Sequence, residues 1–154
     1  CLMKLILMSI ISSLVINLGS INSIFDRETV IPFEKLPAEA QKFLNKHFQG
    51  EDILSIVLDS EIADREYSVY YENGTEVKFD SRGNWESMEH EYSSLPDSVI
   101  PEAILKFVNA KHPEKKVTAI SRDMTGRDKG YEVELDNLLD VKFDIQGRFM
   151  RYDD

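Results

Sequence analysis

The sequence VKFDSRGNW at residues 77–85 returns with few changes as VKFDIQGRF at residues 141–149. In both stretches apolar residues alternate with charged ones, which is the period of a β-strand with one buried face. An Asp follows, and a Gly comes three positions later. The Asp carboxylate can accept backbone N–H groups, and Gly83 and Gly147 can adopt a positive φ. Each stretch therefore predicts a strand, a tight turn and a second strand that carries Trp85 or Phe149.

The two stretches lie 64 residues apart, and this offset holds over most of the chain. Residues 31–88 align with residues 95–152 without a gap, and sixteen of the 58 aligned pairs are identical. Pro37 aligns with Pro101, and Tyr67 aligns with Tyr131. Similarity at a fixed period indicates a duplicated structural unit. We therefore predict two copies, at residues 31–88 and 95–152.

Each copy is predicted to begin with a helix. Pro37 and Pro101 suit the first helical position, where the missing N–H costs nothing. Behind each proline, residues recur at helical spacing and predict a stripe that faces the core. The stripe consists of Leu36, Ala40, Phe43, Leu44 and His47 in the first copy, and of Ile100, Ile104, Phe107, Val108 and Lys111 in the second.

Four strands are predicted to follow the helix in each copy. The first are residues 53–59 and 117–123, and the second carry the alternations Tyr67–Val69–Tyr71 and Tyr131–Val133–Leu135. Asn73-Gly74 predicts a two-residue hairpin before the next strand. A sheet with one apolar face needs a helix layer over that face. The predicted fold is α+β: two tandem α-β-β-β-β repeats forming one antiparallel sheet of about eight strands, with both helices on one face.

The first residues predict export. Residues 2–18 read LMKLILMSIISSLVINL, a single Lys followed by an apolar run that falls short of the roughly 20 residues needed to span a bilayer. We predict a signal peptide at residues 1–23, a domain at residues 24–154, no membrane insertion after signal removal, and a periplasmic or cell-surface location. The single Cys lies within the signal, so no disulfide framework is expected.

Charge and motif content argue against nucleic-acid binding and catalysis. The chain has 18 Lys and Arg against 28 Asp and Glu, a formal net charge of -10, whereas phosphate binding depends on Lys and Arg. The three His lack metal-ligand spacing, and no Gly-rich phosphate loop or G-x-S-x-G motif is present. Asp80 and Asp144 recur because of their place in the turn. We therefore expect no enzyme, no metal and no cofactor.

The polar face of the sheet is the remaining candidate site. The side chains that alternate with the buried set should point away from the helices, and Tyr is enriched at interfaces. The alternative is an ordinary solvated face. The predicted partner-binding residues are Tyr70, Lys78, Glu132, Glu134 and Lys142, and Ser68, Glu76 and Asp140 share their face.

Both copies share L/I-P-x-x-x-x-K-F-x-N, then Y-x-V, then V-K-F-D-x-x-G with an aromatic residue. This pattern resembles the PepSY-like, β-lactamase-inhibitor-like proteins exported by Bacteroides-type bacteria, over about residues 30–153 of this chain. The resemblance implies a fold similar to the β-lactamase inhibitor protein, which grips its enzyme with a concave sheet face. None of that inhibitor's contact residues has a matching motif here. We expect a non-catalytic binding or inhibitory module of the cell envelope, whose partner is a protein or peptide. The alternative is a small-ligand or peptide carrier that uses a groove between sheet and helices.

Overall fold

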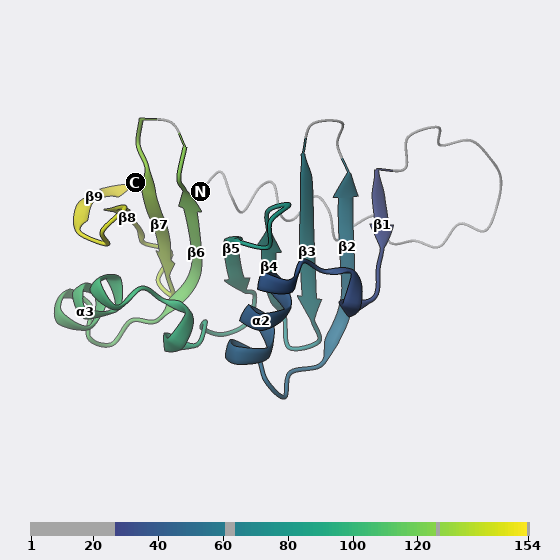
Figure 1. The fold of residues 1–154 in the computed structure, drawn as a ribbon. Coiled ribbons are helices and arrows are strands. Elements are labelled where there is room, and N and C mark those ends of the chain that lie inside the picture. The colour runs from purple at the N-terminus through teal and green to yellow at the C-terminus, as the bar shows by residue number, and fades with distance from the viewer. Residues whose placement is uncertain (1–26, 61–63, 126, 154) are drawn as a thin grey trace.

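The computed structural model describes residues 27–60, 64–125 and 127–153, and the predicted signal peptide at residues 1–23 lies outside them. The described residues form one nine-stranded antiparallel sheet whose strands stand in chain order, so that each strand pairs with its sequence neighbours (Figure 1). The strands are β1 (Glu28–Val30), β2 (Ile53–Ser60), β3 (Arg65–Tyr71), β4 (Thr75–Phe79), β5 (Trp85–His90), β6 (Val117–Asp123), β7 (Gly130–Leu135), β8 (Asp140–Asp144) and β9 (Phe149–Asp153). The helices are α2 (Ala38–His47) and α3 (Glu102–Lys111), each preceded by a short 3₁₀ turn, η2 (Phe33–Lys35) or η3 (Asp97–Val99).

The α+β class and the antiparallel sheet are confirmed, with nine strands instead of about eight. The additional strand is β1, which pairs with β2 through Glu28↔Asp59 and Val30↔Val57. It has only three residues, all exposed, and it precedes residue 31, where the sequence similarity between the two halves begins. Three exposed residues carry no apolar period, so the pattern gave no signal for this strand.

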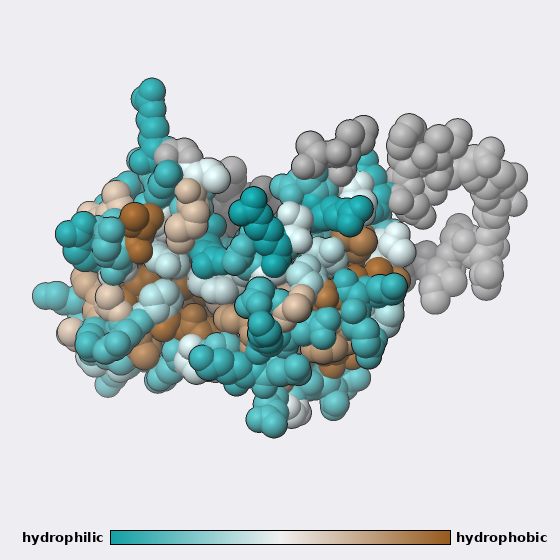
Figure 2. Space-filling view, in the orientation of Figure 1, coloured by the Kyte–Doolittle hydropathy of each residue, from teal (hydrophilic) through white to brown (hydrophobic). Residues whose placement is uncertain are grey.

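Both helices cover the same face of the sheet. The Phe43 ring of α2 lies 5.8 Å from the Phe79 ring, and the Phe107 ring of α3 lies 5.3 Å from the Phe143 ring, both edge-on. Phe79 and Phe143 are fully buried, and each such side chain contributes roughly 1.5–3 kcal/mol through removal from water. Outside this core, the side of the molecule that bears the helices presents mainly hydrophilic side chains (Figure 2).

The structure corrects the helix prediction at three points. Pro37 and Pro101 are the N-cap residues, one position before the helices begin. Lys111 is exposed, because the second helix ends there and its side chain lies beyond the last buried turn. Phe48, which follows the first helix, was missed: it is buried and stacks on Tyr71, with 5.4 Å between the ring centroids.

The hairpin between β3 and β4 is one residue longer than predicted. Its loop consists of residues 72–74, and the Gly74 N–H donates to the Tyr71 carbonyl. The Asn73 side-chain oxygen accepts the Thr75 N–H at 2.9 Å. These two contacts, one between backbone groups and one to the Asn73 side chain, explain the Asn-Gly pair as a turn signal.

The turns after β4 and β8 have the predicted chemistry. Asp80 Oδ1 accepts the N–H groups of Arg82 and Asn84, and Asp144 Oδ1 accepts those of Gln146 and Arg148, all at 2.8–2.9 Å. Gly83 and Gly147 have φ of 86° and 75°, so their predicted positive φ is confirmed. The backbone hydrogen bonds from Arg148 and Gln146, together with the Arg148 side chain, hold the pKa of Asp144 below its usual range. Both carboxylates are therefore part of the turn structure.

Candidate partner-binding face

Strand pairing arranges the polar side chains of the sheet in two rows that run across the strands, on the face opposite the helices. We name them the mixed row and the carboxylate row. The mixed row consists of Ser68, Lys78, Ser87, Ser121, Glu132, Lys142 and Arg151. The carboxylate row consists of Tyr70, Glu76, Glu89, Ala119, Glu134, Asp140 and Asp153. The five predicted partner-binding residues all lie in these rows: Lys78, Glu132 and Lys142 in the first, Tyr70 and Glu134 in the second.

The two lysines of the mixed row are held by carboxylates. Lys78 Nζ lies 3.3 Å from Glu66 Oε1 and 3.9 Å from Glu76 Oε1. Lys142 Nζ lies 3.6 Å from Glu132 Oε2 and 3.3 Å from Asp153 Oδ2. Each lysine thus faces two carboxylates and orients them. The excess charge on this face is negative.

Tyr70 and Glu76 form a half-buried pair across β3 and β4. The Tyr70 hydroxyl donates to the Glu76 carboxylate. Burial, followed by the negative charge of Glu76, raises the pKa of Tyr70 to about 12. Burial also raises the pKa of Glu76, although Lys78 and the Tyr70 hydroxyl act in the opposite direction. Tyr70 therefore stays a neutral hydrogen-bond donor at physiological pH.

The polar face is less uniformly solvated than alternation predicted. Ser68 is only 8% exposed, because its short side chain lies between Val57 and Lys78 on the neighbouring strands. Ala119, in the middle of the carboxylate row, is also buried. Small, buried side chains thus interrupt the charged side chains of this face.

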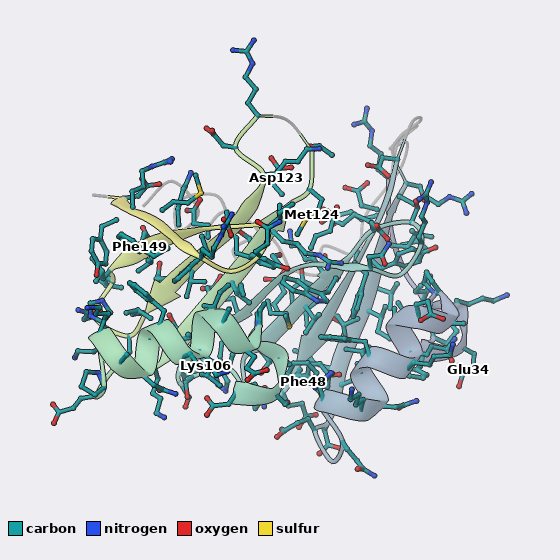
Figure 3. All side chains as sticks on the ribbon, turned by 60° about the vertical axis from the view of Figure 1, so that its left-hand side comes forward. Glu34, Phe48, Lys106, Asp123, Met124 and Phe149 are labelled. Carbon is teal, nitrogen blue, oxygen red and sulfur yellow. The ribbon has the colours of Figure 1, made fainter. Side chains whose placement is uncertain are left out.

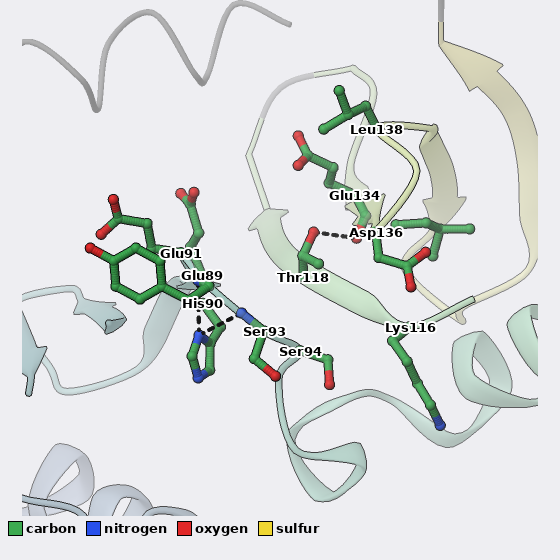
Figure 4. A pocket seen from close by; sticks show the side chains of 12 residues that line it. Glu89, His90, Glu91, Ser93, Ser94, Lys116, Thr118, Glu134, Asp136 and Leu138 are labelled. Carbon is green, nitrogen blue, oxygen red and sulfur yellow. Dashed lines mark hydrogen bonds between the residues drawn. The ribbon is translucent and has the colours of Figure 1, made fainter. Parts of the chain in front are cut away.

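A depression of about 420 Å³ lies next to the carboxylate row, at the end of β5 and the start of β6 (Figure 4). Its lining includes Glu89 and Glu134 from the row and Lys116 from the opposite side. The loop after β5 is fixed by His90, whose Nδ1 accepts the N–H groups of Tyr92 at 3.3 Å and Ser93 at 3.1 Å. This loop places Tyr92 at the depression.

Two residues of the depression were missed in the sequence. Tyr92 is 76% exposed and Leu138 is 64% exposed, and both line the depression. Leu138 has φ of 65° and is the one non-glycine with positive φ among the described residues. In the alignment of the two halves it takes the place of Gly74, whose φ is 90°. A Leu at a position that favours Gly is the sequence signal that could have revealed it.

Residues 27–60, 64–125 and 127–153 contain neither a metal-binding cluster nor a membrane-spanning helix. No group of three or more His, Cys, Asp or Glu side chains is placed to hold a metal ion in this part of the chain. None of the helices found there has the length and apolar character to cross a membrane.

The sequence profile of a protein family described as "Putative beta-lactamase-inhibitor-like, PepSY-like" matches residues 65–151. The chain belongs to this family. The family resemblance inferred from the sequence is thereby confirmed. No match was found among curated proteins.

Three solved structures extend the similarity over most of the chain. A "putative periplasmic protein from DUF2874 family" from Bacteroides vulgatus is 32% identical, with a TM-score of 0.76, covering 84% of this chain and 98% of its own. A "putative calcium-regulated periplasmic protein" from Bacteroides thetaiotaomicron is 34% identical, with a TM-score of 0.78 and the same coverage. A second Bacteroides vulgatus protein, described as periplasmic and of unknown function, is 32% identical with a TM-score of 0.74, covering 82% of this chain and 99% of its own.

Proposed function

We propose that this PepSY-like chain is a non-catalytic, exported binding module that holds a basic segment of an envelope protein or peptide. The composition of the depression carries the proposal. Four carboxylates line it, from Glu89, Glu91, Glu134 and Asp136, against the single lysine Lys116 in its described lining. Tyr92 and Leu138 add exposed apolar area. Aromatic anchors beside complementary charge are typical of protein interfaces.

The polar face supplies the rest of the proposed contact surface. Tyr70 offers a neutral hydroxyl and an aromatic ring, and Glu132 and Glu134 offer charge. Lys78 and Lys142 act by holding Glu76 and Glu132 in place. Export to the periplasm is supported by the similar Bacteroides structures, all described as periplasmic.

The architecture proposed for this function is a pair of copies of one α-β-β-β-β unit, arranged as in the β-lactamase inhibitor protein. Helices α2 and α3 begin 64 residues apart and have the same length. The same offset separates the starts of β2 and β6, and those of β5 and β9. The two units stand side by side in one sheet, so their polar faces form a continuous surface.

A carrier function is the second candidate, and one observation favours it. A depression of about 330 Å³ lies between α2 and the strands β5 and β6, and its lining includes Lys42, Lys46, Trp85 and Arg122. Its cations suit an anionic ligand. Binding of a small anion that is lost in Lys46→Ala and retained after changes on the polar face would favour the carrier.

The binding module is tested by removing charge from the polar face. The variant Glu132→Gln with Glu134→Gln should capture about tenfold less partner from a periplasmic extract, and its capture should depend less on salt, because the steering charge is reduced. The matched control is Glu39→Gln with Glu102→Gln, which removes the same charge from the exposed helix faces. Equal capture by wild type and the sheet variant, or loss in the helix control alone, would refute the proposal.

A further inference from the structure

β9 is the last strand of the sheet, and three of its five residues are exposed large apolar or aromatic side chains. Phe149, Met150 and Tyr152 are 41%, 45% and 43% exposed. The Phe149 ring stacks on Phe107 of α3, with 4.9 Å between centroids and 7° between planes. Figure 3 shows Phe149 on β9, on the side of α3. Edge strands that remain free are usually protected by charged side chains, Pro or a covering loop. The charged side chains of β9 are Arg151 and Asp153, which pair with each other at 2.9 Å, and no Pro or loop of the described residues covers this strand.

The counterpart of β9 in the first half is β5, which is covered. β5 pairs with β6 through Ser87↔Ser121, Met88↔Ile120 and Glu89↔Ala119. Met88 is 1% exposed, whereas Tyr152, which aligns with it at the offset of 64, is 43% exposed. The strand that has a neighbour on this side therefore buries its side chain, and the edge strand leaves the corresponding one partly exposed.

The same comparison applies to the aromatic residue that begins each strand. The Arg122 guanidinium of β6 lies 4.3 Å from the centre of the Trp85 ring, and Arg122 Nε donates to the Trp85 carbonyl. Phe149 aligns with Trp85 and is paired with β8 only, through Phe143. No strand of the described residues stands where β6 stands on β5.

We propose that β9 docks an extended segment of a partner protein as a tenth, antiparallel strand, in the register that β6 adopts on β5. The free edge of β9 corresponds, at the offset of 64, to the edge of β5 that pairs with β6 and joins the two halves. Docking there is β-strand addition, in which the backbone supplies affinity and alternate side chains supply specificity. This inference rests on the two-copy architecture proposed above. It does not depend on the polar face.

The turn beside β9 indicates what side chain the partner places over Phe149. In the first half the neutral Asn84 side chain binds Asp80, and the nearby Arg122 lowers the pKa of Asp80 further. In the second half Arg148 Nε already donates to Asp144 Oδ2 at 2.6 Å. The second turn thus has its own cation. The partner strand should carry an apolar residue at the Arg122 position, as β2 does with Leu58.

The test uses the full chain and a synthetic peptide of residues 116–124 with the change Arg122→Leu. Labelled peptide should bind saturably in fluorescence anisotropy, and the amides of residues 149–153 should gain protection from hydrogen exchange. The unchanged peptide should bind more weakly. Tyr152→Lys should lower the affinity about tenfold, because a charged edge side chain opposes strand addition. Val30→Lys, the same kind of change on the opposite edge strand β1, should leave it unchanged.

Three outcomes would overturn the proposal. They are the absence of peptide binding by wild type, peptide binding that is lost in Val30→Lys but retained in Tyr152→Lys, and self-association of the chain through β9 without peptide binding. Hydrogen exchange on wild type decides the question even where Tyr152→Lys fails to fold. The variant Glu132→Gln with Glu134→Gln should bind the peptide normally, so failure of the polar-face proposal is distinguishable from failure at β9.

Discussion

Three glycines with nearly equal φ allow the stability cost of backbone strain to be distinguished from the cost of close packing. Gly50, Gly83 and Gly147 have φ of 88°, 86° and 75°. A Cβ at Gly50 would have no atom within 4 Å, one at Gly147 would lie 3.0 Å from the Ala103 Cβ, and one at Gly83 would lie 2.8 Å from the Ala40 nitrogen. Gly50→Ala should cost about 1 kcal/mol of unfolding free energy through φ alone.

Gly83→Ala should cost clearly more than Gly50→Ala in urea unfolding, with Gly147→Ala in between. The reason is that the turn at Gly83 packs against the backbone at the start of α2, which cannot shift as a flexible side chain can. Equal losses of unfolding free energy at all three positions would show that the close packing of the Gly83 turn against α2 does not affect stability.

Glu76 provides a pH test of the half-buried pair. Its pKa is raised in the folded chain, so folding favours the protonated form of Glu76. The stability that this contributes to the folded state is fully present below the unfolded pKa and is lost as pH rises through the folded pKa. Glu76→Gln, which keeps an acceptor for Tyr70, should gain stability relative to wild type at pH 7 by less than about 1 kcal/mol. The gain should disappear near pH 4. A gain that grows on acidification would contradict the raised pKa.

At the scale of elements, the Arg122 side chain adds to the strand pairing that joins β5 and β6. Arg122 stacks on Trp85 and bonds its carbonyl, and a Lys cannot reproduce this planar contact. Arg122→Lys should therefore lower the unfolding free energy by about 1 kcal/mol and change the fluorescence of the only tryptophan. Arg65→Lys on the exposed start of β3 is the control. An unchanged fluorescence spectrum in Arg122→Lys would show that the stacking does not persist in solution.

Elements with a strong apolar period were predictable, and the exceptions have local causes. The helical stripes behind Pro37 and Pro101 predicted both helices. The strand patterns of the two halves, including the alternation around Val77 and Val141, predicted eight strands. β1 has too few residues for a period, and Phe48 is buried by tertiary packing on Tyr71 after its helix has ended. Tyr92 could not be placed at the depression from the sequence, because its position depends on the loop that His90 holds.

At the scale of the whole molecule, neither half is expected to be stable alone. A unit of about 60 residues buries only about 60% of the surface its unfolded chain exposes. In the second half, β6 would also lose its pairing with β5. A fragment of residues 93–154 should therefore lack a cooperative thermal transition in circular dichroism, whereas the full chain should unfold in one step. A sharp transition in the fragment would show that the halves fold independently.

The chain-order arrangement of the sheet has a consequence for how the protein reaches its native state. Because each strand pairs only with strands that are adjacent in sequence, the only long connections that pairing must close in the described sheet are the two that carry the helices, between β1 and β2 and between β5 and β6. A sheet of this kind has a low contact order, and we expect it to fold faster than sandwiches of similar size. A chain that emerges from a translocation pore from its N-terminus could pair β1 to β5 before β6 arrives. Until then β5 would be the open edge, just as β9 is in the finished molecule.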